Sequence, residues 1–104
     1  MLQKHTESRN PHDSYRDKPI TRSKDEAIAN IEAFRSQISS EDDFITLASE
    51  HSECRSAGNG GDLGFFGPGQ MQQQFEDAAF ALDVGAMSGL VDSDSGIHII
   101  WRVE

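Results

Sequence analysis

Six of the nine glycines of this 104-residue chain lie between residues 54 and 71, beside the only cysteine. The stretch reads CRSAGNGGDLGFFGPGQM. Because glycine adopts positive φ angles without steric cost, these residues indicate a succession of tight turns. Such turns would bring together the apolar side chains of the stretch, which are Leu63, Phe65, Phe66 and Met71. Because such turns interrupt a helix, the main helices are expected on either side of this segment.

The residues before the segment predict two helices. Ser23 and Glu26 form the capping box SKDE, and the apolar residues behind it recur at helical spacing as one stripe: Ile28, Ile31, Phe34 and Ile38. A second, shorter helix is predicted after Ser39 and Ser40, where acidic residues 41–43 suit the positive end of the helix dipole. Its apolar face comprises Phe44, Leu47, Ala48 and His51.

The residues after the segment predict a third helix and a closing strand. The helix covers roughly residues 72–82, with Phe75, Ala78, Ala79 and Leu82 on one face and Gly85 after its end. The final stretch GIHIIWRVE alternates, which places Ile97, Ile99, Trp101 and Val103 on one side of a strand and His98, Ile100 and Arg102 on the other. Shorter strands are predicted at residues 1–5, around 62–65 and around 90–91. Helices between short, non-adjacent strands indicate a single α+β domain with an antiparallel or mixed sheet.

Charge is distributed unevenly along the chain. Residues 1–24 carry six Lys or Arg against three Asp or Glu, whereas the other 80 residues carry three against 15. Within the basic part, residues 6–19 are polar and lack periodicity, which predicts a long loop. A basic loop on an acidic body suggests a focused anion site, although an ordinary solvated loop explains the same composition.

Composition excludes several classes of protein. The net charge of −9 argues against general binding of nucleic acid, whose phosphates would be repelled. No run of about 18 apolar residues is present, and the first residues turn polar at once, so we expect neither a membrane span nor a secretory signal, and a cytoplasmic or nuclear location. A single cysteine forms no internal disulfide and no CxxC metal or redox pair.

The residue pattern alone leaves the role of Cys54 open. A phosphate loop fails on spacing, because no GK pair followed by Ser or Thr occurs, and Leu63 stands where GxGxxG needs its third glycine. Cys54 and His98 could form a nucleophile and base pair. A buried small hydrophobe and a structural histidine explain the same two residues. Likewise, Leu63, Met71 and Phe75 could be plain core.

Five stretches carry a resemblance to a known family: ITRSKDEAI, DFITLASEHSEC, GGDLGFFGPGQMQQQFEDAAFAL, VGAMSGLV and DSGIHIIWR. In this order they cover nearly the whole chain and resemble the parvulin family of peptidyl-prolyl cis/trans isomerases. The resemblance implies the parvulin, FKBP-like fold, with a four-stranded antiparallel sheet surrounded by about four helices. It also implies one isomerase domain over residues 1–104, and we expect no tryptophan-pair (WW) module before it.

The resemblance implies a catalytic pocket and a proline pocket. Cys54, His98 and Ser95 match residues of a catalytic hydrogen-bond network, and Ser93 takes the place of a network threonine. Leu63, Met71 and Phe75 match the proline pocket, with Gln70 close by. Rotation about an X-Pro bond breaks no bond, so no cofactor or metal is expected, and we favour a non-covalent role for Cys54.

The loop resembles the branch of the family that acts on phosphoserine-proline and phosphothreonine-proline bonds. Lys4 and Arg9 match its phosphate ligands, Asn10 replaces a second arginine, and Arg16 is a candidate auxiliary cation. The family's first-strand histidine would lie four residues before Lys4, just before Met1. Three readings follow: a phosphate-directed isomerase acting on proline-containing peptides as a monomer, a phosphate-independent isomerase or folding helper, and a non-catalytic phosphopeptide-binding module.

Overall fold

The computed structural model describes residues 1–13, 15–64 and 69–103. Its elements, in chain order, are β1 (Leu2–Gln3), β2 (His12–Asp13), β3 (Lys18–Pro19), α1 (Lys24–Ser36), α2 (Glu41–His51), the 3-10 helix η1 (Arg55–Asn59), α3 (Gln73–Ala81), β4 (Val91–Ser93) and β5 (Gly96–His98). This composition confirms the α+β class. Within these residues, no helix is long and apolar enough to cross a membrane.

The main sheet has the antiparallel strand order β1-β5-β4, so the closing strand is central. His98 pairs with Leu2 on one side and with Val91 on the other. In the described part of the chain this sheet has three strands rather than the expected four. The strand predicted around residues 62–65 is not formed at Asp62–Gly64, where the Asp62 carboxylate instead accepts a hydrogen bond from the Gly64 amide at 2.7 Å, and Phe65 lies outside the described residues.

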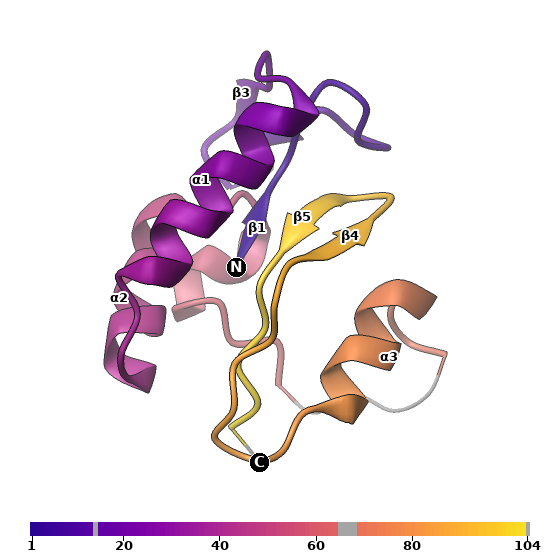
Figure 1. Cartoon of the computed structure of the whole chain (residues 1–104). Helices are drawn as coiled ribbons and strands as arrows, with labels where there is room; N and C mark the ends of the chain where they lie inside the picture. Colours follow the sequence, from indigo (N-terminus) through magenta and orange to yellow (C-terminus); the bar gives the residue numbers. More distant parts are fainter. Residues whose placement is uncertain (14, 65–68, 104) are drawn as a thin grey trace.

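Helices cover both faces of the sheet: α1 and α2 lie on one side and α3 on the other (Figure 1). The first face buries Ile97 and Ile99 with residues of α1 and α2, including Ala27, Ile31, Phe44 and Ala48. The second face buries Val91 and Ile100 against Phe75 and Ala79 of α3. The alternation of Ile97, Ile99 and Ile100 therefore supplies both cores. The predicted strand over residues 96–104 is shorter than expected, because β5 ends at His98 and Val103 is 57% exposed.

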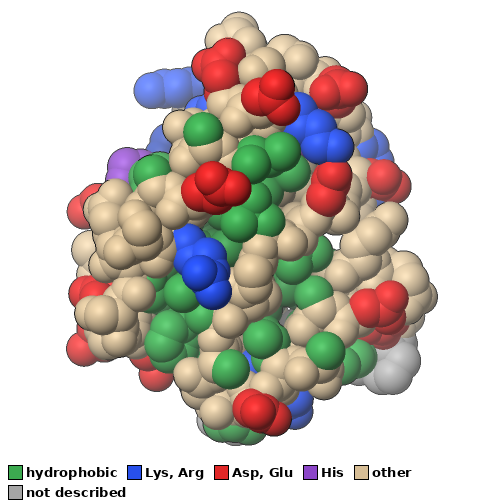
Figure 2. Space-filling model, viewed as in Figure 1, with side chains coloured by type: hydrophobic (Ala, Val, Ile, Leu, Met, Phe, Trp, Pro, Cys, Tyr) green, Lys and Arg blue, Asp and Glu red, His purple; other side chains and the backbone are tan. Residues whose placement is uncertain are grey.

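Local signals correctly predicted where the helices begin. Ser23 caps α1 through the complete capping box with Glu26, and Ser40 caps α2 by accepting from the Asp43 amide. Figure 2 shows acidic side chains spread over one face of the molecule, with apolar side chains exposed between them. This distribution is consistent with the net charge of −9.

The predicted loop over residues 6–19 contains structure of its own. β2 and β3 pair antiparallel, with His12 opposite Pro19 and Asp13 opposite Lys18. The predicted loop therefore includes a short ladder that the sequence did not indicate, because two residues per strand have no periodicity to detect. Ser14 lies outside the described residues.

Two glycines of the glycine-rich segment allow close packing against α2. Gly60 and Gly61 have φ angles of +67° and +82° and follow η1 directly. A Cβ atom at Gly60 would lie 2.8 Å from Cγ2 of Ile45, and one at Gly61 would lie 2.9 Å from Cβ of Ala48. The predicted role of glycine in tight turns is confirmed here, and it lets the segment after Cys54 lie directly on α2.

Candidate active site

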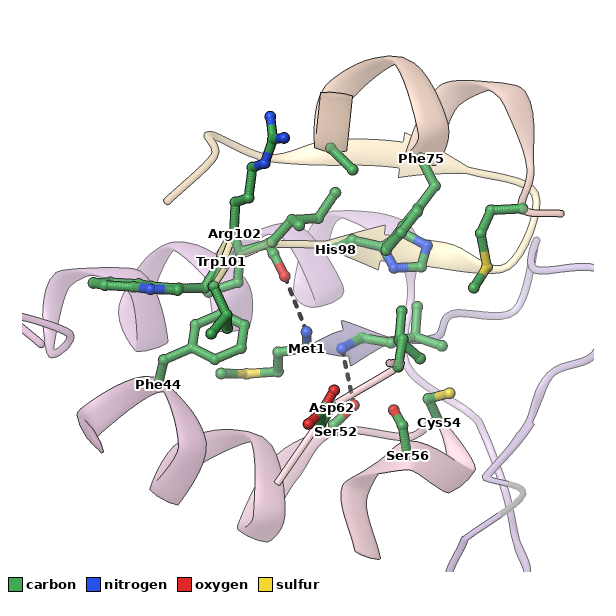
Figure 3. A pocket seen from close by; sticks show the side chains of 18 of the residues that line it. Met1, Phe44, Ser52, Cys54, Ser56, Asp62, Phe75, His98, Trp101 and Arg102 are labelled. Atoms are coloured by element: carbon green, nitrogen blue, oxygen red, sulfur yellow. Dashed lines mark hydrogen bonds between the residues drawn. The ribbon is translucent and has the colours of Figure 1, made fainter. Parts of the chain in front are cut away.

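A cavity of about 850 Å³ opens between β5, α3 and the segment that joins α2 to η1. It brings together residues that are far apart in the sequence. All of the residues predicted for the site line it except Ser93 and Lys4: Arg9, Cys54, Leu63, Gln70, Met71, Phe75, Ser95 and His98. Figure 3 shows His98 from β5 and Cys54 from the start of η1 on opposite sides of the same space.

His98 is a buried imidazole held in a fixed orientation. Its Nε2 shares a hydrogen bond of 2.7 Å with Oγ of Ser93, and the Ser95 amide donates to the same oxygen at 3.3 Å. The ring stacks edge-on against Phe75, with 5.2 Å between centroids. Burial lowers the pKa of His98 from 6.5 to about 3, because desolvation penalises the charged ring. His98 is therefore neutral near pH 7. Ser93 bonds to the imidazole but does not itself line the cavity.

Cys54 is a free, half-buried thiol at the N-terminal cap of η1. The residues before it are fixed against β1, since Leu2 donates its amide to Ser52 Oγ at 3.1 Å and Glu53 donates its amide to the Leu2 carbonyl at 2.9 Å. Within residues 1–13, 15–64 and 69–103, the thiol itself makes no hydrogen bond. Cys54 and His98 thus face one cavity, and of the two only His98 is hydrogen-bonded to Ser93.

The apolar wall of the cavity is formed by Phe75, Met71 and Leu63. Phe75 is buried, Met71 packs half-buried against the α3 cluster, and Leu63 is 40% exposed at the rim. The turn before Met71 is tied to α3, because the buried Glu76 carboxylate accepts from the Gly69 amide at 2.7 Å. Such a wall can hold a small apolar ring away from water while leaving one side open to the polar residues opposite.

The predicted phosphate ligands differ in their availability. The Arg9 side chain is exposed at the cavity, and no hydrogen bond or ion pair of its guanidinium occurs within the described parts of the chain. Lys4 is buried, and its Nζ donates to the His12 carbonyl at 2.5 Å. Arg16, the candidate auxiliary cation, donates instead to carbonyls at the end of α2. Of these three candidate cations, only Arg9 lines the cavity.

Sequence reasoning missed a buried brace behind the site. Glu53, only 5% exposed, accepts at Oε1 from the Lys4 amide at 2.8 Å and pairs with the Arg22 guanidinium. Arg22 also donates to the Lys4 carbonyl at 3.0 Å. Glu53 directly precedes Cys54, so this brace fixes the thiol segment to β1. Charged residues in polar stretches carry no pattern that distinguishes a buried pair from a solvated surface.

The antiparallel sheet with helices on both faces, and a cavity joining a thiol, an imidazole and an apolar wall, agree with the parvulin fold that the sequence resemblance implied. Residues 4–104 match the family described as Rotamase: PPIC-type PPIASE domain, and the chain belongs to this family.

Two curated relatives and one solved structure extend the match. The chain is 49% identical to peptidyl-prolyl cis-trans isomerase ssp-1 of Neurospora crassa, over 100% of this chain and 57% of the relative, and 46% identical to peptidyl-prolyl cis-trans isomerase ESS1 of Saccharomyces cerevisiae, over 99% and 62%. The structure of peptidyl-prolyl isomerase ESS1 from Candida albicans superposes with a TM-score of 0.90 at 37% identity, covering 100% of this chain and 59% of that one. The chain thus spans about three fifths of the length of these relatives.

Proposed function

We propose that this chain catalyses the cis/trans isomerisation of X-Pro peptide bonds. The observation that carries the proposal is the single cavity in which Cys54, Ser95 and His98 face the apolar wall of Leu63, Met71 and Phe75. Membership of the PPIC-type family and the names of its similar relatives support the same activity. The substrate is a proline-containing peptide, and the enzyme acts as a monomer.

The mechanism needs no bond to be broken. Rotation about an X-Pro bond faces a barrier of about 18–20 kcal/mol, and the twisted amide loses the resonance of both planar isomers. A site lowers this barrier when it binds the twisted amide better than either isomer. The apolar wall would hold the proline ring, and the neutral imidazole of His98 would leave no buried positive charge to favour the planar, polarised amide. Cys54 would shape the polarity around the carbonyl without attacking it.

Arg9 supports a preference for phosphorylated Ser-Pro and Thr-Pro bonds. Its guanidinium is exposed at the cavity, where the residue before the proline would lie, and charge-assisted bonds to phosphate are among the stronger ones. Two observations favour the alternative that isomerisation ignores phosphate. Asn10 replaces a second cation, and the ammonium of Lys4 already donates to the His12 carbonyl.

A protease-coupled assay on matched pSer-Pro, Glu-Pro and Ala-Pro peptides tests both the isomerase activity and the preference for phosphorylated substrates. We expect turnover of all three, fastest for pSer-Pro. Arg9→Ala should lower kcat/KM on pSer-Pro by about 10- to 100-fold, the equivalent of one charge-assisted contact, and leave Ala-Pro unchanged. Lys18→Ala, which removes an exposed cation from the same loop, is the matched control. Equal wild-type rates on pSer-Pro and Ala-Pro would refute the phosphate preference, and binding without turnover would identify a phosphopeptide-binding module instead.

The role of Cys54 is tested separately by Cys54→Ser. A non-covalent role predicts that the variant retains most of the wild-type kcat/KM, because a hydroxyl preserves the polarity of the site. Near-complete loss in a variant that keeps its fold by circular dichroism would refute the non-covalent role.

A further inference from the structure

Arg16 joins the loop over residues 6–19 to the end of α2. Its guanidinium donates to three backbone carbonyls there, Ser49 at 3.2 Å, Glu50 at 2.6 Å and Ser52 at 2.7 Å. The last of these carbonyls lies two residues before Cys54. Helix C-terminal carbonyls have no partner within the helix, and an arginine that binds them also complements the helix dipole.

The guanidinium is oriented from its own loop by Asp13. This buried carboxylate pairs with Nη1 of Arg16 at 3.2 Å, and its other oxygen accepts from the amides of Tyr15 and Arg16, both at 3.0 Å. Two Nη1 bonds and two Nη2 bonds occupy four of the five N–H donors of an arginine. Arg16 is therefore committed to backbone carbonyls and Asp13 rather than presented to an anion.

Tyr15 supplies a second contact with the segment after Cys54. Its ring lies over Gly58 of η1, where a Cβ atom would come within 3.2 Å of Cε2. The Arg16 guanidinium carbon lies 5.2 Å from the centroid of the same ring, within the range of a cation–π contact. The loop thus contacts the chain on both sides of Cys54, at Ser52 and at Gly58.

We propose that Arg16 is a positioning residue for Cys54. The segment from Ser52 to Cys54 is held on one side by β1, through Leu2, and on the other side by Arg16. Loss of the guanidinium frees the Ser52 carbonyl and lets the thiol shift relative to His98 and the apolar wall. A displacement of about 1 Å in a catalytic group can cost up to about 100-fold in rate. The turnover part of this proposal rests on the proposed isomerase function, whereas the position of the thiol does not.

The experiment compares Arg16→Ala, Arg16→Lys and the control Lys18→Ala in the full chain. We measure kcat and KM on pSer-Pro and Ala-Pro peptides, and the rate of Cys54 alkylation by iodoacetamide well below the midpoint of thermal unfolding. Arg16→Ala should lower kcat/KM by about 10-fold or more on both peptides, and alkylate several-fold faster than wild type. Arg16→Lys should recover only part of each effect, because a lysine lacks the planar fork that bridges several carbonyls. Lys18→Ala should match wild type.

Three results would overturn the proposal. A loss confined to pSer-Pro would make Arg16 a phosphate contact. A lower unfolding temperature with wild-type kinetics and alkylation in the folded protein would leave it a purely stabilising residue. An alkylation rate equal to wild type in Arg16→Ala would refute the positioning role, whether or not the chain has isomerase activity. If the chain has no isomerase activity but Arg16→Ala is alkylated faster, the positioning role is supported and only the proposed function is refuted.

Discussion

His98 is expected to make the stability of this fold strongly dependent on pH. Burial holds its folded-state pKa at about 3, against 6.5 in the unfolded chain. Between these values the unfolded chain binds a proton at His98 and the folded chain does not, so stability is present above pH 6.5 and is lost as the pH falls towards 3. One pH unit corresponds to about 1.4 kcal/mol, which gives a loss of about 2 kcal/mol between pH 7.5 and pH 5 from this residue.

The assay is urea unfolding of the wild type and His98→Gln at several pH values between 7.5 and 5. Glutamine keeps a hydrogen-bonding group near Ser93 but does not titrate. We expect the difference in unfolding free energy between the two proteins to change by about 2 kcal/mol over this range, whatever its value at pH 7.5. His51→Gln removes a half-exposed imidazole and controls for the loss of a histidine as such. Parallel pH curves for wild type and His98→Gln, or an NMR titration of His98 near pH 6.5, would refute the reasoning.

Three further substitutions test the fold. Gly96→Ala should destabilise the protein by at least about 2 kcal/mol, because Gly96 has φ +141° and a Cβ would lie 2.5 Å from the Gln3 carbonyl oxygen. Gly85→Ala is the control and should cost only about 1 kcal/mol, because φ is +83° there but no described atom lies within 4 Å of the added Cβ. Equal losses of unfolding free energy in urea would contradict this argument. Ser23→Ala should cost about 1 kcal/mol by removing the α1 capping box, and an unchanged urea midpoint would show that the cap contributes nothing.

The parts of the fold that depend on neighbouring residues were predictable from the sequence. The capping box of Ser23 and Glu26 is a local pattern that the structure reproduces, and the alternation in the last strand holds for residues 97–100. The β2–β3 ladder was not predictable, because its residues are fixed by Arg16 bonding to α2, more than 30 residues away in sequence. The irregular course at Asp62–Gly64 is an exception, because it was missed although its bond is local: the Gly64 amide donates to the Asp62 carboxylate two residues before it.

The site required more than pattern. Periodicity predicted that His98 lies on a strand and Phe75 on a helix, but it did not decide whether either residue belongs to the core or to a catalytic site. Only the resemblance to a family predicted that both lie in one site with Cys54. The pair of half-buried Arg22 and buried Glu53 was predicted neither from periodicity nor from the resemblance. Its two charges come from segments 31 residues apart, so nothing local to either one shows that they meet.

The packing of Gly60 and Gly61 on α2 has a consequence for how this wall of the site can evolve. Each glycine lies where a side chain would collide with one particular residue of the helix, Ile45 for the first and Ala48 for the second. Room made on α2 would not be enough to admit a side chain, because both glycines also have positive φ angles that strain other residues. Glycine is therefore expected to be retained at both positions across relatives, even where the facing residues of α2 change.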